Sequence, residues 1–334
     1  MTIKDLSAQT GYSVGTISRA LNNQPNVSEK ARSVILKAAA ESGFQLNANA
    51  KQLKQQHSNS ILVLAKGSSN ELFGALIEAM QARMSKTNYP LIVDYNEGTI
   101  NEVRHAIQLC IEKKPLGVLF LGGNREHFLA DFDKIKVPSV LVTNDATGLP
   151  FDNLSSVAPN NIQAAEMAID HLVSLGHRKI AVIGSNRKHS DTTNLRWEGC
   201  MRAFDRHNIS FDPERDYASV QYTFAGGYLG AQQLLESGRD FTAIFAMSDV
   251  MAIGAIRALR DAGKRVPEDI SVIGFDGLNL GEYTVPKLST ICQPIEELAE
   301  RSIRMLMENI ESNQGPRYEI IPVELIQKES TREI

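Results

Sequence analysis

Short and hydroxylated side chains gather near the start of the sequence, in YSVGTISRALNN, residues 12–23. Small side chains let a helix approach another molecule closely, and hydroxyl and amide groups can bond phosphate oxygens. A valine can contact a thymine methyl group, and an arginine can bond guanine or phosphate. We therefore interpret this stretch as a helix that reads DNA. The residues expected to contact DNA here are Ser13, Val14, Gly15, Thr16, Ser18, Arg19 and Asn22.

The flanking residues predict the element that positions this helix. Thr2 and Asp5 have the spacing of a capping box, which opens a first helix that ends at Gly11. Ser13 can cap the second helix and Ser28 a third. Two helices joined by a tight glycine-containing turn and braced by a third form a helix-turn-helix, whose second helix enters the major groove. A small solvated helix pair is the alternative.

Charge is distributed unevenly along the 334 residues. The net charge is −4 at pH 7, yet the first 54 residues carry seven Lys/Arg against three Asp/Glu, which leaves −8 for the remainder. A basic head on an acidic body indicates an anionic partner, and double-stranded DNA fits that description.

A polar linker, QLNANAKQLKQQHSNS, spans residues 45–60. A helix of about seven residues inside it would be marginal without a partner. Leu46 and Leu53 are the only large apolar residues in this polar stretch. Leu53 is either packed on its own domain or inserted as a wedge between base pairs in the minor groove, with Lys51 and Lys54 on phosphates.

From residue 60 onward, short apolar runs alternate with amphipathic helical stretches. The runs are SILVLA, PLIVDY, GVLFLG and PSVLVT, and after residue 160 KIAVIG, YASVQY, TAIFAM and ISVIGF. This alternation predicts an α/β fold with two doubly wound lobes built on parallel sheets. The remaining elements near the C-terminus are too few for a third domain. We therefore expect the chain to cross between the lobes more than once and to form a hinged cleft.

Polar side chains follow several of these strands. Asp276 comes directly after SVIGF, Ser248 follows TAIFAM, and Arg196 lies in NLRWEG. Ligands of open α/β sheets bind beyond the carboxyl ends of the strands. A paired arginine and aspartate can hold neighbouring hydroxyls, and the ring of Phe73 or Tyr222 can stack on a sugar. The alternatives are a salt bridge between the lobes for the charged pair and plain core packing for the aromatic rings.

Several classes of protein are disfavoured. No apolar run approaches the ~18 residues of a membrane span, and MTIKDLSAQTG lacks the features of a secretory signal, so a cytoplasmic location is expected. Cys110, Cys200 and Cys292 have no spacing typical of a zinc site or disulfide framework. No nucleophile elbow, phosphate-binding loop or metal-ligand cluster is found. We therefore expect no catalytic residue, metal or cofactor; the competing class is a metabolite-binding enzyme with a basic appendage.

Motifs along the whole chain resemble the LacI/GalR family of bacterial transcription repressors. They are TIKDLSAQTGYSVGTISRALNN, LGHRKIAVIG, MSDVMAIGAIRALRDAGKRVPEDISVIGFD, PKLSTICQP and ELIQKEST. The resemblance implies a helix-turn-helix head, a hinge helix and a core like that of periplasmic sugar-binding proteins. Leu53 falls where the family inserts a leucine into the operator. Positions that line the family's effector pocket match Phe73, Arg196, Tyr222, Ser248 and Asp276.

Two departures from the family pattern affect these expectations. Leu46 stands where most relatives have proline, so the hinge is expected to be entered less rigidly. Ser185-Asn186 replaces the usual Gly-Pro after a strand, which changes the loop near the effector.

Together these patterns predict a homodimeric repressor that binds operator DNA under the control of an effector, most simply a sugar or sugar derivative; a nucleoside or purine corepressor is the alternative. The expected domains are a helix-turn-helix (1–46), a hinge (47–59) and an effector-binding and dimerisation core (60–334). Within the core we expect an N-lobe of about 60–158 plus 291–320 and a C-lobe of about 159–290 plus 321–330. No heptad repeat that would indicate a tetramer follows QKESTREI.

Overall fold

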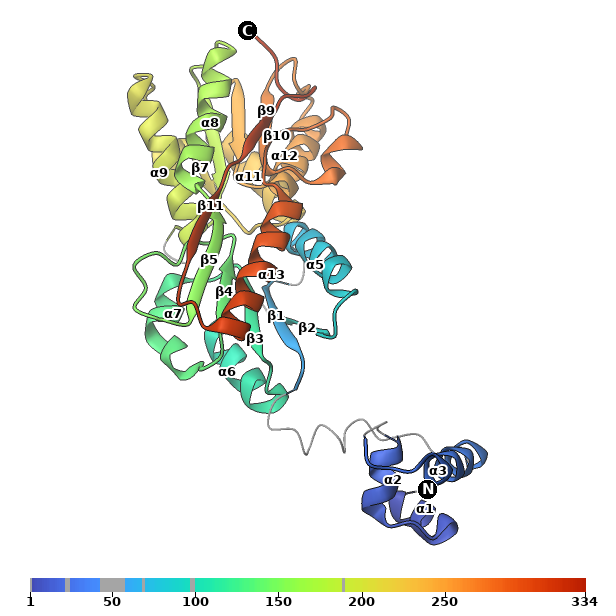
Figure 1. The fold of residues 1–334 in the computed structure, drawn as a ribbon. Coiled ribbons are helices and arrows are strands. Elements are labelled where there is room, and N and C mark those ends of the chain that lie inside the picture. The colour runs from blue at the N-terminus through green and yellow to red at the C-terminus, as the bar shows by residue number, and fades with distance from the viewer. Residues whose placement is uncertain (1, 22–24, 43–57, 68–69, 97–99, 188–189) are drawn as a thin grey trace. The chain divides into compact units, whose positions relative to one another are not determined.

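A computed structural model describes residues 2–21, 25–42, 58–67, 70–96, 100–187 and 190–334. The chain forms two compact units, Met1–His57 and Ser58–Ile334 (Figure 1). Among the helices within the described ranges, none has the length and apolarity that a membrane crossing requires.

The described part of the first unit contains three helices: α1 (Ile3–Thr10), α2 (Val14–Leu21) and α3 (Glu29–Glu41). Their apolar faces meet in a small core that includes Leu6, Ile17 and Ile35. This arrangement confirms the predicted helix-turn-helix head.

Local caps define where these helices begin and end. The Thr2 hydroxyl accepts a hydrogen bond from the Asp5 amide, and the Asp5 carboxylate accepts one from the Thr2 amide at 2.7 Å, which is the predicted capping box. Gly11 ends α1 at a φ of 74°, a conformation that glycine adopts without steric cost. Ser28 caps α3 by accepting from the Ala31 amide.

In the second unit, six described strands form the first sheet, in the order β11-β5-β4-β3-β1-β2, and all neighbouring strands are parallel. We call this sheet and its helices the N-lobe. Helices cover both faces, so β1 and β3 to β5 are almost entirely buried, as expected for apolar strands of a parallel sheet. The strands are β1 (Ile61–Lys66), β2 (Leu91–Asn96), β3 (Gly117–Leu121), β4 (Ser139–Val142), β5 (Leu154–Pro159) and β11 (Tyr318–Ile321). The helices are α5 (Glu71–Met84), α6 (Glu102–Lys113), α7 (Arg125–Asp131), the 3-10 turn η1 (Phe132–Lys134) and α13 (Ile295–Ser312).

The second sheet has the order β12-β10-β9-β8-β6-β7 in the described residues, with β12 antiparallel to β10 and the other pairs parallel. We call this sheet and its helices the C-lobe. The strands are β6 (Ile180–Gly184), β7 (Tyr217–Ser219), β8 (Ala243–Ala246), β9 (Ser271–Asp276), β10 (Ser289–Cys292) and β12 (Glu324–Ile326). The helices are α8 (Asn161–Ser174), α9 (Asp191–Arg206), α10 (Pro213–Asp216), α11 (Phe224–Glu236), α12 (Asp249–Asp261) and the 3-10 turn η2 (Asn279–Glu282).

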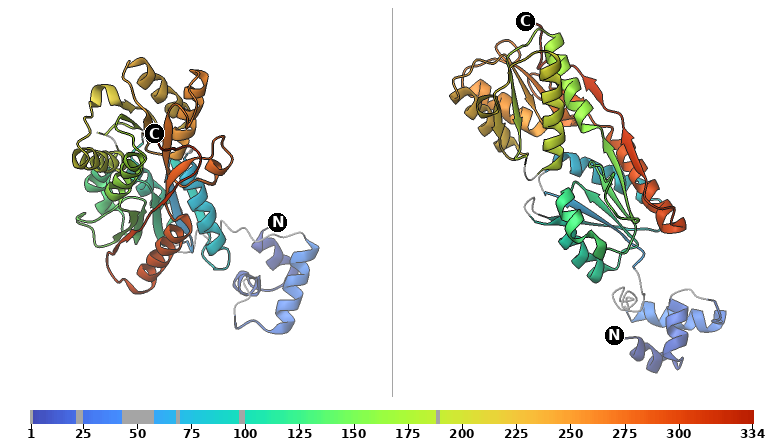
Figure 2. Two further views of the ribbon diagram at one scale, coloured as in Figure 1. Left: turned by 90° about the horizontal axis from the view of Figure 1, so that it is seen from above. Right: turned by 90° about the vertical axis from the view of Figure 1, so that its left-hand side faces the viewer.

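The chain passes between the lobes after β5, after β10 and after β11 (Figure 2). Helix α13 therefore follows a C-lobe strand but packs on α5 and on the N-lobe strands β3, β4 and β5. Strand pairing places all of β10 in the C-lobe, two residues beyond the boundary that the sequence patterns suggest. The two sheets confirm the predicted α/β core of two lobes.

Candidate nucleic-acid interface and effector site

Helix α2 presents one side to solvent and buries the other. Ile17 and Ala20 are buried in the head's core, whereas Ser13, Val14, Gly15 and Arg19 are exposed and Thr16 and Ser18 are half-buried. The exposed side of α2 thus carries the short side chains and the arginine that are predicted to contact DNA. Asn22, Lys51, Leu53 and Lys54 lie outside the described residues, as does Leu46.

Local hydrogen bonds occupy the polar groups of this surface. The Ser13 and Thr16 hydroxyls lie 2.9 Å apart, and Nε of Arg19 donates to the Gly15 carbonyl at 3.2 Å. The Arg19 side chain therefore folds along its own helix here, and contact with a base would require it to extend from this position.

In the C-lobe, Arg196 and Asp276 come together at the carboxyl ends of the parallel strands. Arg196 projects from α9, Asp276 ends β9, and the side chains are 5% and 8% exposed. Nη2 of Arg196 lies 3.8 Å from Oδ1 of Asp276, which is longer than a hydrogen bond. Burial raises the pKa of Asp276 to about 6, and the Arg196 cation opposes this rise.

Neighbouring groups fix the Arg196 guanidinium. Its Nε donates to Oδ1 of Asn161 at 2.9 Å, and Nη1 donates to the Met247 carbonyl. The guanidinium also lies 3.4 Å from the centre of the Phe275 ring. The predicted alternative of a salt bridge between lobes does not describe this pair, because both members belong to the C-lobe.

Ser248 and Tyr222 lie at the same end of the C-lobe sheet. Ser248 is the N-cap of α12, and its hydroxyl accepts from the Met251 amide at 3.3 Å. The Tyr222 hydroxyl lies 2.9 Å from Oγ1 of Thr193 on α9, one turn before Arg196.

Asp249 is the first residue of α12, directly after the Ser248 cap. Its buried carboxylate accepts from the Leu278 amide at 2.7 Å and from the Thr290 hydroxyl at 2.6 Å, which links α12 to the ends of β9 and β10. Burial, together with the nearby charge of Asp276, raises the pKa of Asp249 to about 8.

Phe73 lies on α5 of the N-lobe, whereas Arg196 lies on α9 of the C-lobe. It is buried in the core that α5 and α13 share, and a Cβ on Gly122 would come within 2.8 Å of its ring. Val250 and Leu278 of the C-lobe belong to the same core cluster. The ring is therefore buried in a cluster that contains residues of both lobes, and its place in the effector pocket stays a prediction.

Hydrogen bonds also join the lobes. Nδ2 of Asn144, which follows β4, donates to Oγ1 of Thr192 on α9 at 3.2 Å. The Arg125 amide, at the start of α7, donates to the carboxylate of Asp191 at the start of α9. The two lobes are thus in direct contact through these hydrogen bonds, an arrangement we call closed.

Asn161 and Gln293 also contact this site, although neither is among the site residues predicted from the sequence. Asn161 bonds Arg196, and Nε2 of Gln293 donates to Oδ1 of Asp276 at 2.8 Å. Each residue lies just after a strand, β5 or β10, where the chain passes to the other lobe. A polar residue at a strand's carboxyl end is the signal that could have identified them.

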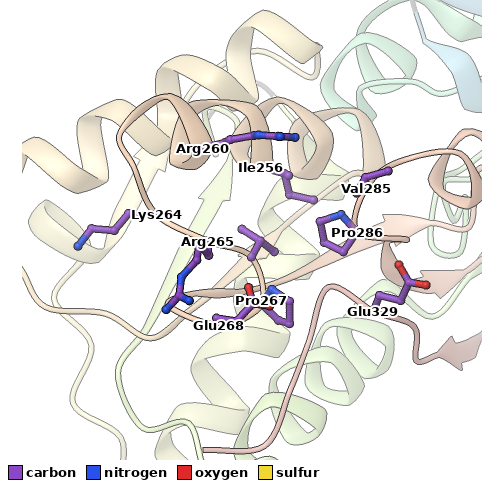
Figure 3. Close-up of a pocket in the computed structure, with 10 residues that line it drawn as sticks. Ile256, Arg260, Lys264, Arg265, Pro267, Glu268, Val285, Pro286 and Glu329 are labelled. Atoms are coloured by element: carbon purple, nitrogen blue, oxygen red, sulfur yellow. The ribbon is translucent and has the colours of Figure 1, made fainter.

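An open cavity of about 460 Å³ lies elsewhere, at the C-terminal end of α12 (Figure 3). Ser248 caps the opposite end of this 13-residue helix, about 20 Å away at 1.5 Å per residue. The cavity is therefore separate from the Arg196 group. It is lined by Ile256, Arg260, Lys264, Arg265, Val266, Pro267, Glu268, Val285, Pro286 and Glu329. Across the described ranges, no three His, Cys, Asp or Glu residues are grouped so that they could hold a metal ion.

A helix-turn-helix head joined to a two-lobed α/β core defines a class of ligand-responsive regulators, and comparison with known proteins supports this. Residues 2–47 match the model for bacterial regulatory proteins of the lacI family, and residues 169–331 match a periplasmic binding protein-like domain. The HTH-type transcriptional regulator MalR of Clostridium butyricum is 32% identical over 99% of both chains.

Solved structures agree with the sequence matches. The lac repressor dimer bound to operator and the anti-inducer ONPF superposes with a TM-score of 0.83, at 25% identity over 99% of each chain. A LacI family regulator from Enterococcus faecium with bound ribose gives a TM-score of 0.71 at 26% identity, over 82% of this chain and 99% of that one. The chain belongs to the LacI family and is a DNA-binding transcriptional regulator rather than an enzyme, which confirms the predicted resemblance.

Proposed function

We propose that this protein is a repressor that binds operator DNA as a homodimer and releases or holds it according to a polyhydroxylated small molecule bound between its lobes. The observation that carries this proposal is the 3.8 Å separation of Arg196 Nη2 and Asp276 Oδ1 inside a buried site. Because the two groups are too far apart to bond directly, a ligand hydroxyl can accept from the arginine and donate to the aspartate.

The DNA-binding part of the proposal rests on the exposed side of α2. Val14 and Gly15 leave room for close approach to base edges, while Ser13 and Arg19 supply donors for phosphate or guanine. From the linker, Lys51 and Lys54 would neutralise phosphates and Leu53 would enter the minor groove. The structure of the lac repressor dimer on its operator supports both the duplex partner and the dimer.

Control by a ligand requires that the ligand bind two arrangements of the lobes with different affinity. The hydrogen bonds from Asn144 to Thr192 and from Arg125 to Asp191 stabilise the closed arrangement. Arg196 and Asp276 both belong to the C-lobe, so a ligand held by them would add to that stability through the contacts it also makes with the N-lobe. We therefore infer that a ligand in contact with both lobes favours closure, and that opening admits it to the buried pair.

A sugar or sugar derivative is the effector class that these groups fit best, and the ribose-bound relative supports it. Thermal-shift measurements against sugars, sugar phosphates, nucleosides and purines test this, because a ligand that binds only the folded state raises Tm. We expect a sugar to raise the Tm of the wild type but not of Asp276→Asn. A shift with nucleosides or purines alone would instead support the corepressor alternative.

A further inference from the structure

A second cavity lies in the C-lobe, at the amino ends of β6, β7 and β8. Its volume is about 360 Å³, within the range that small-molecule ligands occupy in proteins. Arg196 and Asp276 lie at the opposite, carboxyl edge of the same sheet, and the five residues of β6 alone span about 16 Å between the two edges. The cavity is therefore separate from the effector site. It is lined by Arg178, Lys179, Ile180, Ser210, Arg215, Asp216, Gly238, Arg239, Asp240 and Phe241.

Four cations and two carboxylates line this cavity, and each carboxylate has a cation of its own. Nε of Arg239 lies 2.9 Å from Oδ1 of Asp216, and Nζ of Lys179 lies 2.7 Å from Oδ2 of Asp240. Asp216 is also buried, and its Oδ2 accepts from the Asp212 amide at 2.8 Å. Both carboxylates are thus compensated, and the remaining charge of the lining is positive.

Arg178 and Arg215 supply this remaining charge. Nη1 of Arg178 donates to the Val173 and His177 carbonyls, each at 2.9 Å. Nη2 of Arg215 donates to the Ser237 carbonyl at 3.5 Å. Within the described ranges neither guanidinium has a carboxylate partner, so main-chain carbonyls position both cations without neutralising them. Two uncompensated cations on one cavity repel each other, and an anion bound between them would remove that repulsion.

We propose that this cavity is a binding site for a small organic anion, whose phosphate or carboxylate group lies between Arg178 and Arg215. The N–H groups of a guanidinium match the oxygens of either anion. The half-buried side chain of Phe241 offers an apolar surface to the rest of the ligand. The site gives the protein a second small-molecule ligand, besides the effector proposed between the lobes.

The surrounding charge makes this cavity distinct. Residues 55–334 carry a net charge of −8, so most of the core repels anions. A cationic cavity in such a body selects anions locally, whereas the basic head is a separate unit of the chain.

The test measures the Kd of the full-length protein for two probes by calorimetry, at an ionic strength held constant with sodium chloride so that general screening does not vary. Glycerol 3-phosphate carries phosphate as its only anionic group, and citrate carries only carboxylates. We expect at least one probe to bind the wild type and Asp276→Asn with the same affinity, because the cavity is remote from Asp276.

Substitution of the two arginines locates the bound anion. Arg215→Gln should weaken binding about tenfold or more, the effect of losing a hydrogen bond between charged groups. Arg215→Lys keeps the charge without the planar pair of donors and should lose less affinity. Arg178→Gln should weaken binding as Arg215→Gln does, and its Tm is measured as well, because Arg178 also bonds the end of α8. The matched control is Arg202→Gln, which removes an exposed arginine on α9 and should keep the wild-type Kd.

The outcomes separate this inference from the proposed function. Weaker binding in the Arg178 and Arg215 variants, with wild-type binding in Arg202→Gln and Asp276→Asn, supports the inference, and the probe that binds identifies the anionic group. Absence of binding by both probes overturns it. Equal affinity of the wild type and Arg215→Gln also overturns it, because the anion then lies elsewhere, as on the basic head. Loss of binding in Asp276→Asn alone would assign the probe to the proposed effector site, so that only this inference fails.

Discussion

The main-chain amide of Arg125 donates a hydrogen bond to Oδ2 of Asp191 at 2.5 Å. Arg125 begins α7 of the N-lobe, and Asp191 begins α9 of the C-lobe, the helix that carries Arg196. A carboxylate of one lobe thus satisfies the first turn of a helix in the other, where free N–H groups attract negative charge. The hydrogen bond joins the two lobes and is therefore a contact of the closed arrangement.

Asp191→Ala should therefore weaken effector binding several-fold, because it removes a bond that stabilises closure. The loss of one hydrogen bond is worth about 1 kcal/mol. Asp191→Asn keeps an acceptor oxygen and should restore most of the affinity. The comparison is the Kd of each variant for the ligand found by thermal shift. An equal loss of affinity in both variants would show that closure does not depend on this acceptor.

Arg196→Met should abolish the ligand response and lower the free energy of unfolding by about 3 kcal/mol, because it leaves the Asp276 carboxylate buried without its cation. Binding of operator DNA by the head should persist. Arg202 provides the control, since it lies on the same helix in an exposed pair with Glu198, and Arg202→Met should change stability by less than about 1 kcal/mol. Chemical denaturation of both variants measures the difference, and a similar loss in the two would refute the special role of the buried pair.

Asp249 predicts a specific dependence of stability on pH. Its pKa is about 8 in the folded protein, above the ordinary value of 3.8, so between these values the folded state binds more protons than the unfolded state. Stability from this group is therefore greatest at low pH and falls as pH rises from about 4 to about 8.

Other groups titrate in the same pH range, so the test compares the wild type with a variant that lacks the Asp249 carboxyl group. Asp276 has a pKa of about 6, so its contribution to stability also falls as pH rises. Burial lowers the pKa of His171 and His177, so their contribution to stability rises with pH. Between about pH 4 and 8, the free energy of unfolding should fall less in Asp249→Asn than in the wild type. Chemical denaturation of both proteins across that range measures the difference. Parallel curves for the two proteins would mean that Asp249 stays ionised.

Two helix glycines have different surroundings, so replacing each by alanine should have opposite effects. A Cβ at Gly227 would lie 2.0 Å from the Met251 carbonyl oxygen, so Gly227→Ala must force α11 and α12 apart and should cost about 3 kcal/mol. A Cβ on Gly74 in α5 would meet nothing within 4 Å outside its own stretch of helix, and Gly74→Ala should stabilise by about 0.5–1 kcal/mol. Chemical denaturation of both variants gives their midpoints. If the two midpoints shift in the same direction from the wild-type value, the packing described here is contradicted.

Much of this fold can be predicted from the sequence because its signals are local. The Thr2 and Asp5 capping box, the turn at Gly11 and the alternation of apolar strands with helices depend on neighbouring residues. The same reasoning places Arg196, Ser248 and Asp276 at the carboxyl ends of strands, since a parallel sheet brings these ends to one edge.

The remaining contacts depend on the topology of the finished chain. Asn161 reaches Arg196, Gln293 reaches Asp276, and Thr290 bonds Asp249 across 41 residues, all through the order in which strands join the C-lobe sheet. No local pattern specifies that order. Phe73 shows the same limit, because an aromatic residue at the start of a helix has the same signature whether it stacks on a ligand or fills the core.

The most direct test of the central claim is the affinity of the full-length protein for operator DNA, selected in vitro with the wild type and measured by fluorescence anisotropy with and without the sugar that raises Tm. We expect the sugar to change the Kd of the wild type at least tenfold and to leave that of Asp276→Asn unchanged. An unchanged wild-type Kd, or an equal change in Asp276→Asn, would contradict control of DNA binding through this site.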